Sequence, residues 1–158
     1  RLFIDYDLCF GCYACEMACK QENHLPDGIR LIEVKEEHRK KKDGTYDVIF
    51  RLNLCRHCDD PPCIPVCPVE AIAQRTDGIV ILNSEECTGC EACLEACPYD
   101  AIVFDEKNSV ARKCNLCYQR VDSGLLPACA DNICLGHCIH FGDEDAIQEI
   151  PSGVRTAE

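Results

Sequence analysis

The stretch CTGCEACLEACPYDAI, residues 87–102, places four cysteines within eleven residues and then a proline. The whole protein has 17 cysteines among 158 residues, far more than an ordinary globular domain contains. Such a density indicates either a disulfide framework in a secreted protein or metal ligation. Disulfides fit poorly, because the number is odd and cysteines three residues apart can close only strained or unhelpful bridges. We therefore interpret the cysteines as metal ligands.

Sixteen of the cysteines fall into four groups with related spacing. Groups one and three share the pattern C-x2-C-x2-C-x3-C, and group three ends in a proline. Group two, CRHCDDPPCIPVCP, has the same pattern with two residues inserted, and group four is stretched to C-x2-C-x11-C-x4-C. The members are Cys9, Cys12, Cys15 and Cys19 in group one, Cys55, Cys58, Cys63 and Cys67 in group two, Cys87, Cys90, Cys93 and Cys97 in group three, and Cys114, Cys117, Cys129 and Cys134 in group four, with Cys138 left over.

This spacing suits a [4Fe-4S] cubane. Three cysteines at intervals of three residues on a tight loop can each reach a different iron, and the fourth iron then needs a remote ligand. In bacterial ferredoxin runs the fourth cysteine, followed by proline, binds the other cluster. Cys67-Pro68 and Cys97-Pro98 have this ending, so groups two and three form one reciprocal pair. Groups one and four are left to complement each other through Cys19 and Cys134.

Structural zinc is the competing interpretation, because two C-x2-C pairs can bind one zinc ion. Zinc takes four ligands from two such pairs, whereas each group here alone nearly supplies four. The long x11 gap makes group four the least specific of the patterns. A zinc-binding scaffold therefore stays as the alternative of another class, and colour separates the two, since an iron–sulfur protein is brown and a zinc protein is colourless.

The pattern predicts an α+β fold made of two bacterial-ferredoxin-like units, with short strands and helices wrapped around four iron–sulfur clusters. Strands are expected at residues 1–7 and 47–54, and a cysteine loop running into a helix at 11–23. Residues 71–83 read as a hairpin turning at Asp77-Gly78, and residues 101–114 as a second hairpin.

The pairing of the groups divides the chain into segments. Residues 1–23 and 105–145 form a terminal unit with groups one and four, and residues 47–104 form a central unit with groups two and three. Residues 24–46, which include the polar run EVKEEHRKKKDG, are expected to be an insertion in a solvated loop. Residues 146–158 form a C-terminal tail.

The other polar residues form no recognisable catalytic constellation. The five histidines are scattered, and the sequence has no glycine-rich phosphate loop. We interpret His57 as a loop side chain, whereas His137 and His140 flank Cys138 and can tune a cluster by hydrogen bonding. The protein is therefore expected to carry out no bond chemistry of its own.

Charge and hydropathy restrict the partners. The net charge is −12, and four cubanes with their thiolates would add roughly −8, at about −2 each. This argues against nucleic acid and favours a protein partner with basic residues. Lys20, Arg112 and Lys113 lie beside ligands and are expected to raise the potentials of nearby clusters. No apolar run approaches a membrane span or a signal peptide, so we expect a cytoplasmic protein, or a periplasmic one if it is exported with a partner.

The order of the groups resembles the four-cluster ferredoxin subunits of molybdenum and tungsten oxidoreductases. The resemblance rests on CRHCDDPPC in group two, CTGCEACLEACPYDA in group three, and KCNLCYQRVDSGLLPAC followed by FGD in group four. That family includes the electron-transfer subunits of dimethyl sulfoxide, polysulfide and formate-related enzymes, and the small polyferredoxin subunit of tungsten aldehyde oxidoreductases. The resemblance extends from Phe3 to about Asp143 and is specific for the cofactor, but only weakly specific for the partner enzyme.

The resemblance implies four ligand sets, each with three cysteines of one group and one of its partner group. The family usually has three residues between the last two ligands of group four, whereas CADNIC has four. Counting back from FGD assigns Cys134 to the final position, with Cys138 as the alternative ligand. The sets are Cys9, Cys12, Cys15 and Cys134 for cluster 1, Cys55, Cys58, Cys63 and Cys97 for cluster 2, Cys87, Cys90, Cys93 and Cys67 for cluster 3, and Cys114, Cys117, Cys129 and Cys19 for cluster 4.

The function implied is that of a polyferredoxin subunit. It would relay single electrons through four [4Fe-4S] clusters between a catalytic molybdenum- or tungsten-pterin subunit and a second redox subunit, flavin- or quinol-linked. We favour a tungsten aldehyde oxidoreductase as the partner, because the chain is compact, has no evident export signal and ends 15 residues after Asp143. The alternative is the relay of a dimethyl sulfoxide or polysulfide reductase-like, quinol-linked enzyme. Two outward cluster-bearing ends would also permit head-to-tail association of copies.

Overall fold

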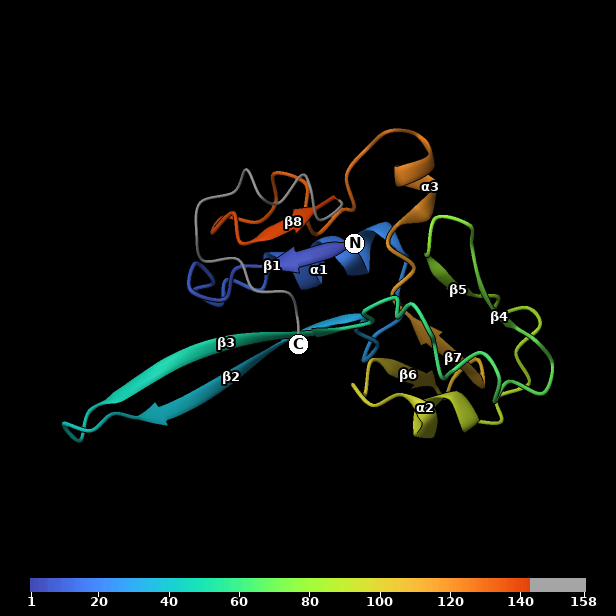
Figure 1. Cartoon of the computed structure of the whole chain (residues 1–158), viewed down its shortest axis with the longest axis horizontal. Helices are drawn as coiled ribbons and strands as arrows, with labels where there is room; N and C mark the ends of the chain where they lie inside the picture. The colour runs from blue at the N-terminus through green and yellow to red at the C-terminus, as the bar shows by residue number, and fades with distance from the viewer. Residues whose placement is uncertain (143–158) are drawn as a thin grey trace.

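The computed structural model describes residues 1–142 and shows short strands and helices joined by long cysteine-bearing loops (Figure 1). The expected tail, 146–158, and the end of the expected terminal unit lie outside the described residues. The strands are β1 (Leu2–Ile4), β2 (Ile32–Lys40), β3 (Tyr46–Leu54), β4 (Ile72–Gln74), β5 (Val80–Leu82), β6 (Ile102–Asp105), β7 (Val110–Lys113) and β8 (Ile139–Phe141), and the helices are α1 (Ala14–Glu22), α2 (Ala92–Ala96) and α3 (Tyr118–Asp122).

These strands form four antiparallel pairs that alternate with the cysteine groups. The hairpin β2–β3 lies between groups one and two, β4–β5 between groups two and three, and β6–β7 between groups three and four. The fourth pair, β1–β8, joins the segment before group one to the segment after group four, with Leu2 opposite Phe141. The described chain therefore closes on itself, and its first strand lies beside its last (Figure 1).

Most of the expected elements are confirmed. Strands occur within residues 1–7 and 47–54, α1 follows the first cysteine loop, and both predicted hairpins form. The expected boundary between the central and terminal units, after residue 104, falls inside strand β6, which pairs with β7. Within the described residues, no helix is long and apolar enough to cross a bilayer.

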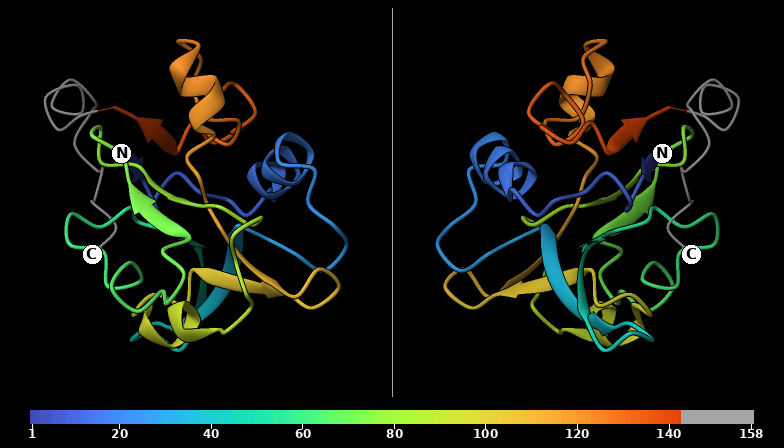
Figure 2. Two further views of the ribbon diagram at one scale, coloured as in Figure 1. Left: turned by 90° about the vertical axis from the view of Figure 1, so that its right-hand side faces the viewer. Right: turned by 90° about the vertical axis from the view of Figure 1, so that its left-hand side faces the viewer.

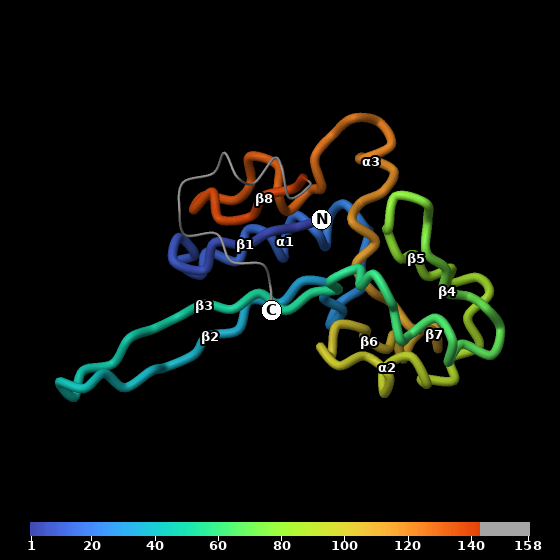
Figure 3. The backbone as a smooth tube through the Cα atoms, in the orientation of Figure 1, coloured from blue at the N-terminus to red at the C-terminus, as the bar shows by residue number. Residues whose placement is uncertain are grey.

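The expectation of a loop at residues 24–46 is wrong for its second half. Strand β2 pairs with β3 over nine residues, and the two form a long ribbon that extends away from the rest of the molecule (Figure 3). Near the core Ile32 and Val34 are buried, whereas residues 36–40 are all exposed. The outer ribbon meets solvent on both faces, so its strand has no alternation of apolar and polar residues to recognise.

Two small cores hold the fold together, and cysteines are a large part of both. One joins α1, the inner ends of β2 and β3, and the strands β1 and β8, through residues such as Ile4, Leu52 and Ile139. The other core joins strands β4, β5, β6 and β7 through residues such as Ile72 and Val80. Figure 2 shows the helices spread around the molecule rather than packed against one another. Cysteine side chains are therefore a substantial part of the buried space, beside the aliphatic residues.

Candidate iron–sulfur centres

All four cysteine groups begin with the same backbone turn. The residue two positions after the first cysteine has a positive φ in each group: +70° at Gly11, +50° at His57, +70° at Gly89 and +54° at Leu116. At Gly89 a Cβ atom would lie 2.4 Å from the carbonyl oxygen of Ser109, so the third loop also requires glycine for close approach. The insertions in groups two and four therefore leave the start of the loop unchanged.

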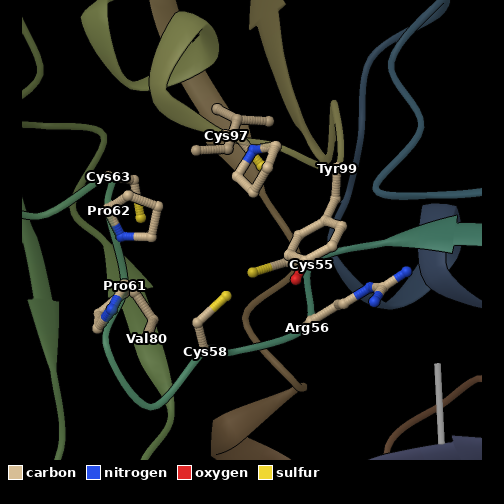
Figure 4. Close-up of a pocket in the computed structure, with 11 residues that line it drawn as sticks. Cys55, Arg56, Cys58, Pro61, Pro62, Cys63, Val80, Cys97 and Tyr99 are labelled. Carbon is tan, nitrogen blue, oxygen red and sulfur yellow. The ribbon is translucent and has the colours of Figure 1, made fainter. Parts of the chain in front are cut away.

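The group-two loop forms a cavity with one cysteine of group three. Its wall contains Cys55, Cys58 and Cys63 together with Cys97. The sulfur atoms of Cys55 and Cys58 point into this space, beside Pro61 (Figure 4). The guanidinium of Arg56 lies 3.8 Å from the ring centre of Tyr99, which links the loop to the segment that carries Cys97.

The group-three loop forms a matching cavity. It is lined by Cys87, Cys90 and Cys93 together with Cys67 from group two, and its apolar wall includes Ile72, Leu82 and Ala111. The central pair is thus reciprocal: each cavity has three cysteines of one group and the last cysteine of the other.

The cysteines of groups one and four lie close together in one buried cluster. Burial, with smaller contributions from the nearby Cys134 and Cys9, raises the pKa of Cys15 to about 12. Burial likewise raises the pKa of Cys19, and there the neighbouring sulfurs are those of Cys114 and Cys117. Clustered buried thiols cannot all ionise without a compensating cation, so this environment suits metal-bound thiolates.

The stretched end of group four brings two thiols together. The sulfur of Cys138 lies 3.5 Å from that of Cys134, and both residues are buried. The backbone N–H of Cys138 donates to the Cys134 sulfur at 3.4 Å. Burial, followed by the hydrogen bond with Cys134, raises the pKa of Cys138.

Polar hydrogens close to the sulfur atoms fit bound iron–sulfur clusters. Backbone N–H groups donate to Cys67 from Ala71 at 3.3 Å, to Cys87 from Ala111 at 3.4 Å, and to Cys114 from Leu116 at 3.4 Å. Donors of this kind stabilise anionic sulfur and are one of the factors that set cluster potentials. In the part of the protein that the structure describes, no three His, Cys, Asp or Glu side chains converge on a point that could hold a single metal ion.

The expectation that His57 is simply a loop side chain is incomplete, since the residue is only 4% exposed. Its Nδ1 atom accepts a hydrogen bond of 3.0 Å from the N–H of Val80, and burial lowers its pKa to about 3. Its Nε2 atom is buried and has no partner among residues 1–142. The Nε2 atom of His57, buried beside a cysteine loop and without a hydrogen-bond partner in the described residues, is also suited to donate to a sulfur acceptor. The sequence contains one signal of this special position: groups one and three have glycine two residues after the first cysteine, where group two has His57.

Of the three basic residues expected to act on clusters, only Lys113 is buried. Arg112 pairs with Asp105 at 2.7 Å, and Lys20 donates to the carbonyl of Pro26 at 3.1 Å. His140 also has a buried Nε2 atom without a partner in the described residues, whereas His137 is exposed.

Comparisons with known proteins agree with this geometry. Two family profiles described as a 4Fe-4S dicluster domain match residues 46–144 and residues 8–71. The protein is 41% identical over 144 residues to a subunit of the tetrathionate reductase of Salmonella typhimurium, with 90% of this protein and 57% of that one covered. It is 39% identical over 141 residues to a component of the polysulfide reductase of Wolinella succinogenes, with 88% and 73% covered. It is 35% identical over 154 residues to a component of the anaerobic dimethyl sulfoxide reductase of Escherichia coli, with 93% and 75% covered.

Proposed function

This protein belongs to the 4Fe-4S dicluster family of reductase iron–sulfur subunits, and on that premise we propose that it is the electron relay of a molybdenum-dependent reductase complex. It is a non-catalytic electron-transfer subunit whose cofactors are [4Fe-4S] clusters. The relatives give no support to the tungsten aldehyde oxidoreductase favoured above. They agree better with the alternative, a relay of the dimethyl sulfoxide and polysulfide reductase kind.

The observation that carries this proposal is the reciprocal lining of the two central cavities. A bound [4Fe-4S] cluster accepts and releases one electron. The protein would hold one cluster on Cys55, Cys58, Cys63 and Cys97, and another on the cysteines of the matching cavity. The fold would then wrap around four such clusters as two ferredoxin-like units, with the terminal pair built in the same reciprocal way.

Three repeated features support Cys134 over Cys138 as the remote ligand in the terminal pair. A residue with positive φ stands three positions after three of the four remote ligands, Cys67, Cys97 and Cys134, namely at Glu70, Asp100 and His137. A strand begins with isoleucine five positions after each, at Ile72, Ile102 and Ile139. The amide four positions on donates to the sulfur in two cases, from Ala71 to Cys67 and from Cys138 to Cys134. Cys138 thus occupies the position that alanine occupies in groups two and three.

Contacts between groups support one line of four clusters. Cys129 lies near Cys15, which joins group four to group one. Burial raises the pKa of Cys114 to about 12, and the next contribution comes from Cys55 of group two. Burial raises the pKa of Cys93 to about 11, with Cys63 among its neighbours. The cysteine groups therefore follow one another in the order one, four, two, three.

The exposed cysteines lie at the two ends of this line. They are Cys12 in group one and Cys90 in group three. We propose that the line connects a catalytic pterin subunit at one end with a second, quinol- or flavin-linked redox subunit at the other. The same arrangement leaves head-to-tail association of copies as a prediction.

The test is anaerobic purification of the protein with its natural complex. Iron and acid-labile sulfide are each expected at about 16 per chain, together with a co-purifying subunit that contains molybdenum. Tungsten in that subunit would instead favour a tungsten aldehyde oxidoreductase as the partner. Zinc in place of iron would contradict the relay itself, and about 12 iron would show that one group, the stretched fourth above all, holds a smaller cluster or none.

A further inference from the structure

Lys113 ends β7 and is only 5% exposed. Lysine is rarely buried unless its charge is compensated. Its Nζ atom donates to the backbone carbonyl of Val80, in β5, and to that of Cys114 at 2.8 Å. Both acceptors are neutral, so in the described contacts the positive charge is solvated by carbonyl dipoles and is not cancelled by a carboxylate.

The attachment point, Val80, is 1% exposed and lies on the edge of a two-stranded sheet. Its carbonyl accepts from Lys113 and its N–H donates to Nδ1 of His57. Two side chains therefore satisfy the polar groups that a third strand would otherwise satisfy. Since Nδ1 is an acceptor, a neutral His57 carries its proton on the buried Nε2 atom.

This lysine lies where the central pair of cysteine groups meets group four. Its acceptor Val80 also lines the cavity formed by Cys55, Cys58, Cys63 and Cys97. Its second acceptor is the backbone carbonyl of Cys114, the first cysteine of group four. Its charge therefore lies beside the group-two cavity and beside the first cysteine of group four, on either side of the junction.

We propose that Lys113 raises the reduction potentials of the two clusters next to this junction, those held by the loops of groups two and four. A fixed positive charge in a dry environment stabilises the more negative, reduced state of each. Neither Arg112 nor Lys20 is equivalent, because Arg112 is paired with Asp105 and Lys20 lies 3.6 Å from Asp27. The proposal rests on the proposed function, and it assigns a tuning role to the junction between the two halves of the relay.

The test is a redox titration followed by electron paramagnetic resonance, on the complex as purified. Lys113→Gln keeps a hydrogen-bond donor and removes the charge, Lys113→Met removes both, and Lys113→Arg keeps the charge. The matched control is Lys107→Gln, an exposed lysine in the turn of the same hairpin. In Lys113→Gln two of the four reduction potentials should fall by about 59 mV each. This corresponds to a roughly ten-fold change in the equilibrium constant for one-electron reduction. Lys113→Arg should restore them, and Lys107→Gln should move none.

The shifted couples should include the one whose spectrum is altered by Cys58→Ser. Full iron content with four unmoved potentials in Lys113→Gln would overturn the proposal. An equal shift of all four potentials would also overturn it. Loss of iron in Lys113→Gln would do the same, because it would assign the lysine to folding alone. If Lys113→Met does not assemble, Lys113→Gln decides. Absence of clusters from the unmodified protein would instead refute the proposed function.

Discussion

At the scale of single residues, Cys134 and Cys138 show how conformation separates two candidates that spacing leaves open. Their sulfurs are 3.5 Å apart and both are buried, so neither burial nor proximity distinguishes them. The backbone does, because the residue three positions after Cys134 is left-handed and a strand follows two residues later, as it does after Cys67 and Cys97. The local conformation therefore favours Cys134 as the ligand.

Substituting Cys134 by Ser should lower the iron content and alter the spectrum of the cluster held by Cys9, Cys12 and Cys15. The cause is that serine replaces the thiolate on the fourth iron. The signals of the central pair should stay unchanged. Cys138→Ser is the matched control and should leave the iron content as it is. Iron analysis and low-temperature electron paramagnetic resonance check both, and the reverse pattern would exchange the roles of the two cysteines.

At the scale of elements, three hairpins serve as spacers of different length between the cysteine groups, and the fourth strand pair, β1–β8, joins the segments outside them. Hairpins β4–β5 and β6–β7 have three or four residues per strand, whereas β2–β3 has nine. Only the inner end of the long ribbon packs in the core, through Ile32, Val34, Leu52 and Leu54. Farther out, charged pairs such as Lys41 with Asp47, 3.4 Å apart, join the strands in solvent, where ion pairs contribute little stability.

Two substitutions on the same face of β3 should differ sharply. Leu52→Ala removes a side chain that is 6% exposed and should lower the free energy of unfolding by about 2–5 kcal/mol. Val48→Ala, at a position 45% exposed, should change it by no more than about 0.5 kcal/mol. Anaerobic guanidinium unfolding, followed by circular dichroism, compares the midpoints. Equal effects would mean that the outer ribbon is packed in solution.

At the scale of the whole molecule, metal binding takes over much of the role of a hydrophobic core. The described residues bury few large apolar side chains, and nine of the cysteines are buried among them, including Cys15, Cys63, Cys93 and Cys129. Thiols raised in pKa by burial must deprotonate to bind iron, so binding and folding are coupled. The closure of the described residues through β1 and β8 depends on the same groups, since these strands flank Cys9 and Cys134.

Anaerobic removal of iron with a chelator should therefore abolish most of the secondary structure, because the remaining apolar contacts cannot offset the conformational entropy of folding. Far-ultraviolet circular dichroism measures the loss, and an untreated sample kept anaerobically in the same buffer is the control. A native-like spectrum in the iron-free protein would show that the two small cores are sufficient to maintain the fold.

The sequence by itself determined the type of cofactor, the four cysteine groups and two short hairpins, because each depends on neighbours within a few residues. Spacing of three residues places sulfurs around one loop, and Asp77-Gly78 suits a positive φ. Only the tertiary structure decided that residues 32–40 form a strand, that Lys113 is buried and donates to the carbonyl of Val80, and that His57 accepts from the N–H of the same residue. These features depend on which surfaces distant segments cover, and a local pattern of polar residues does not contain that information.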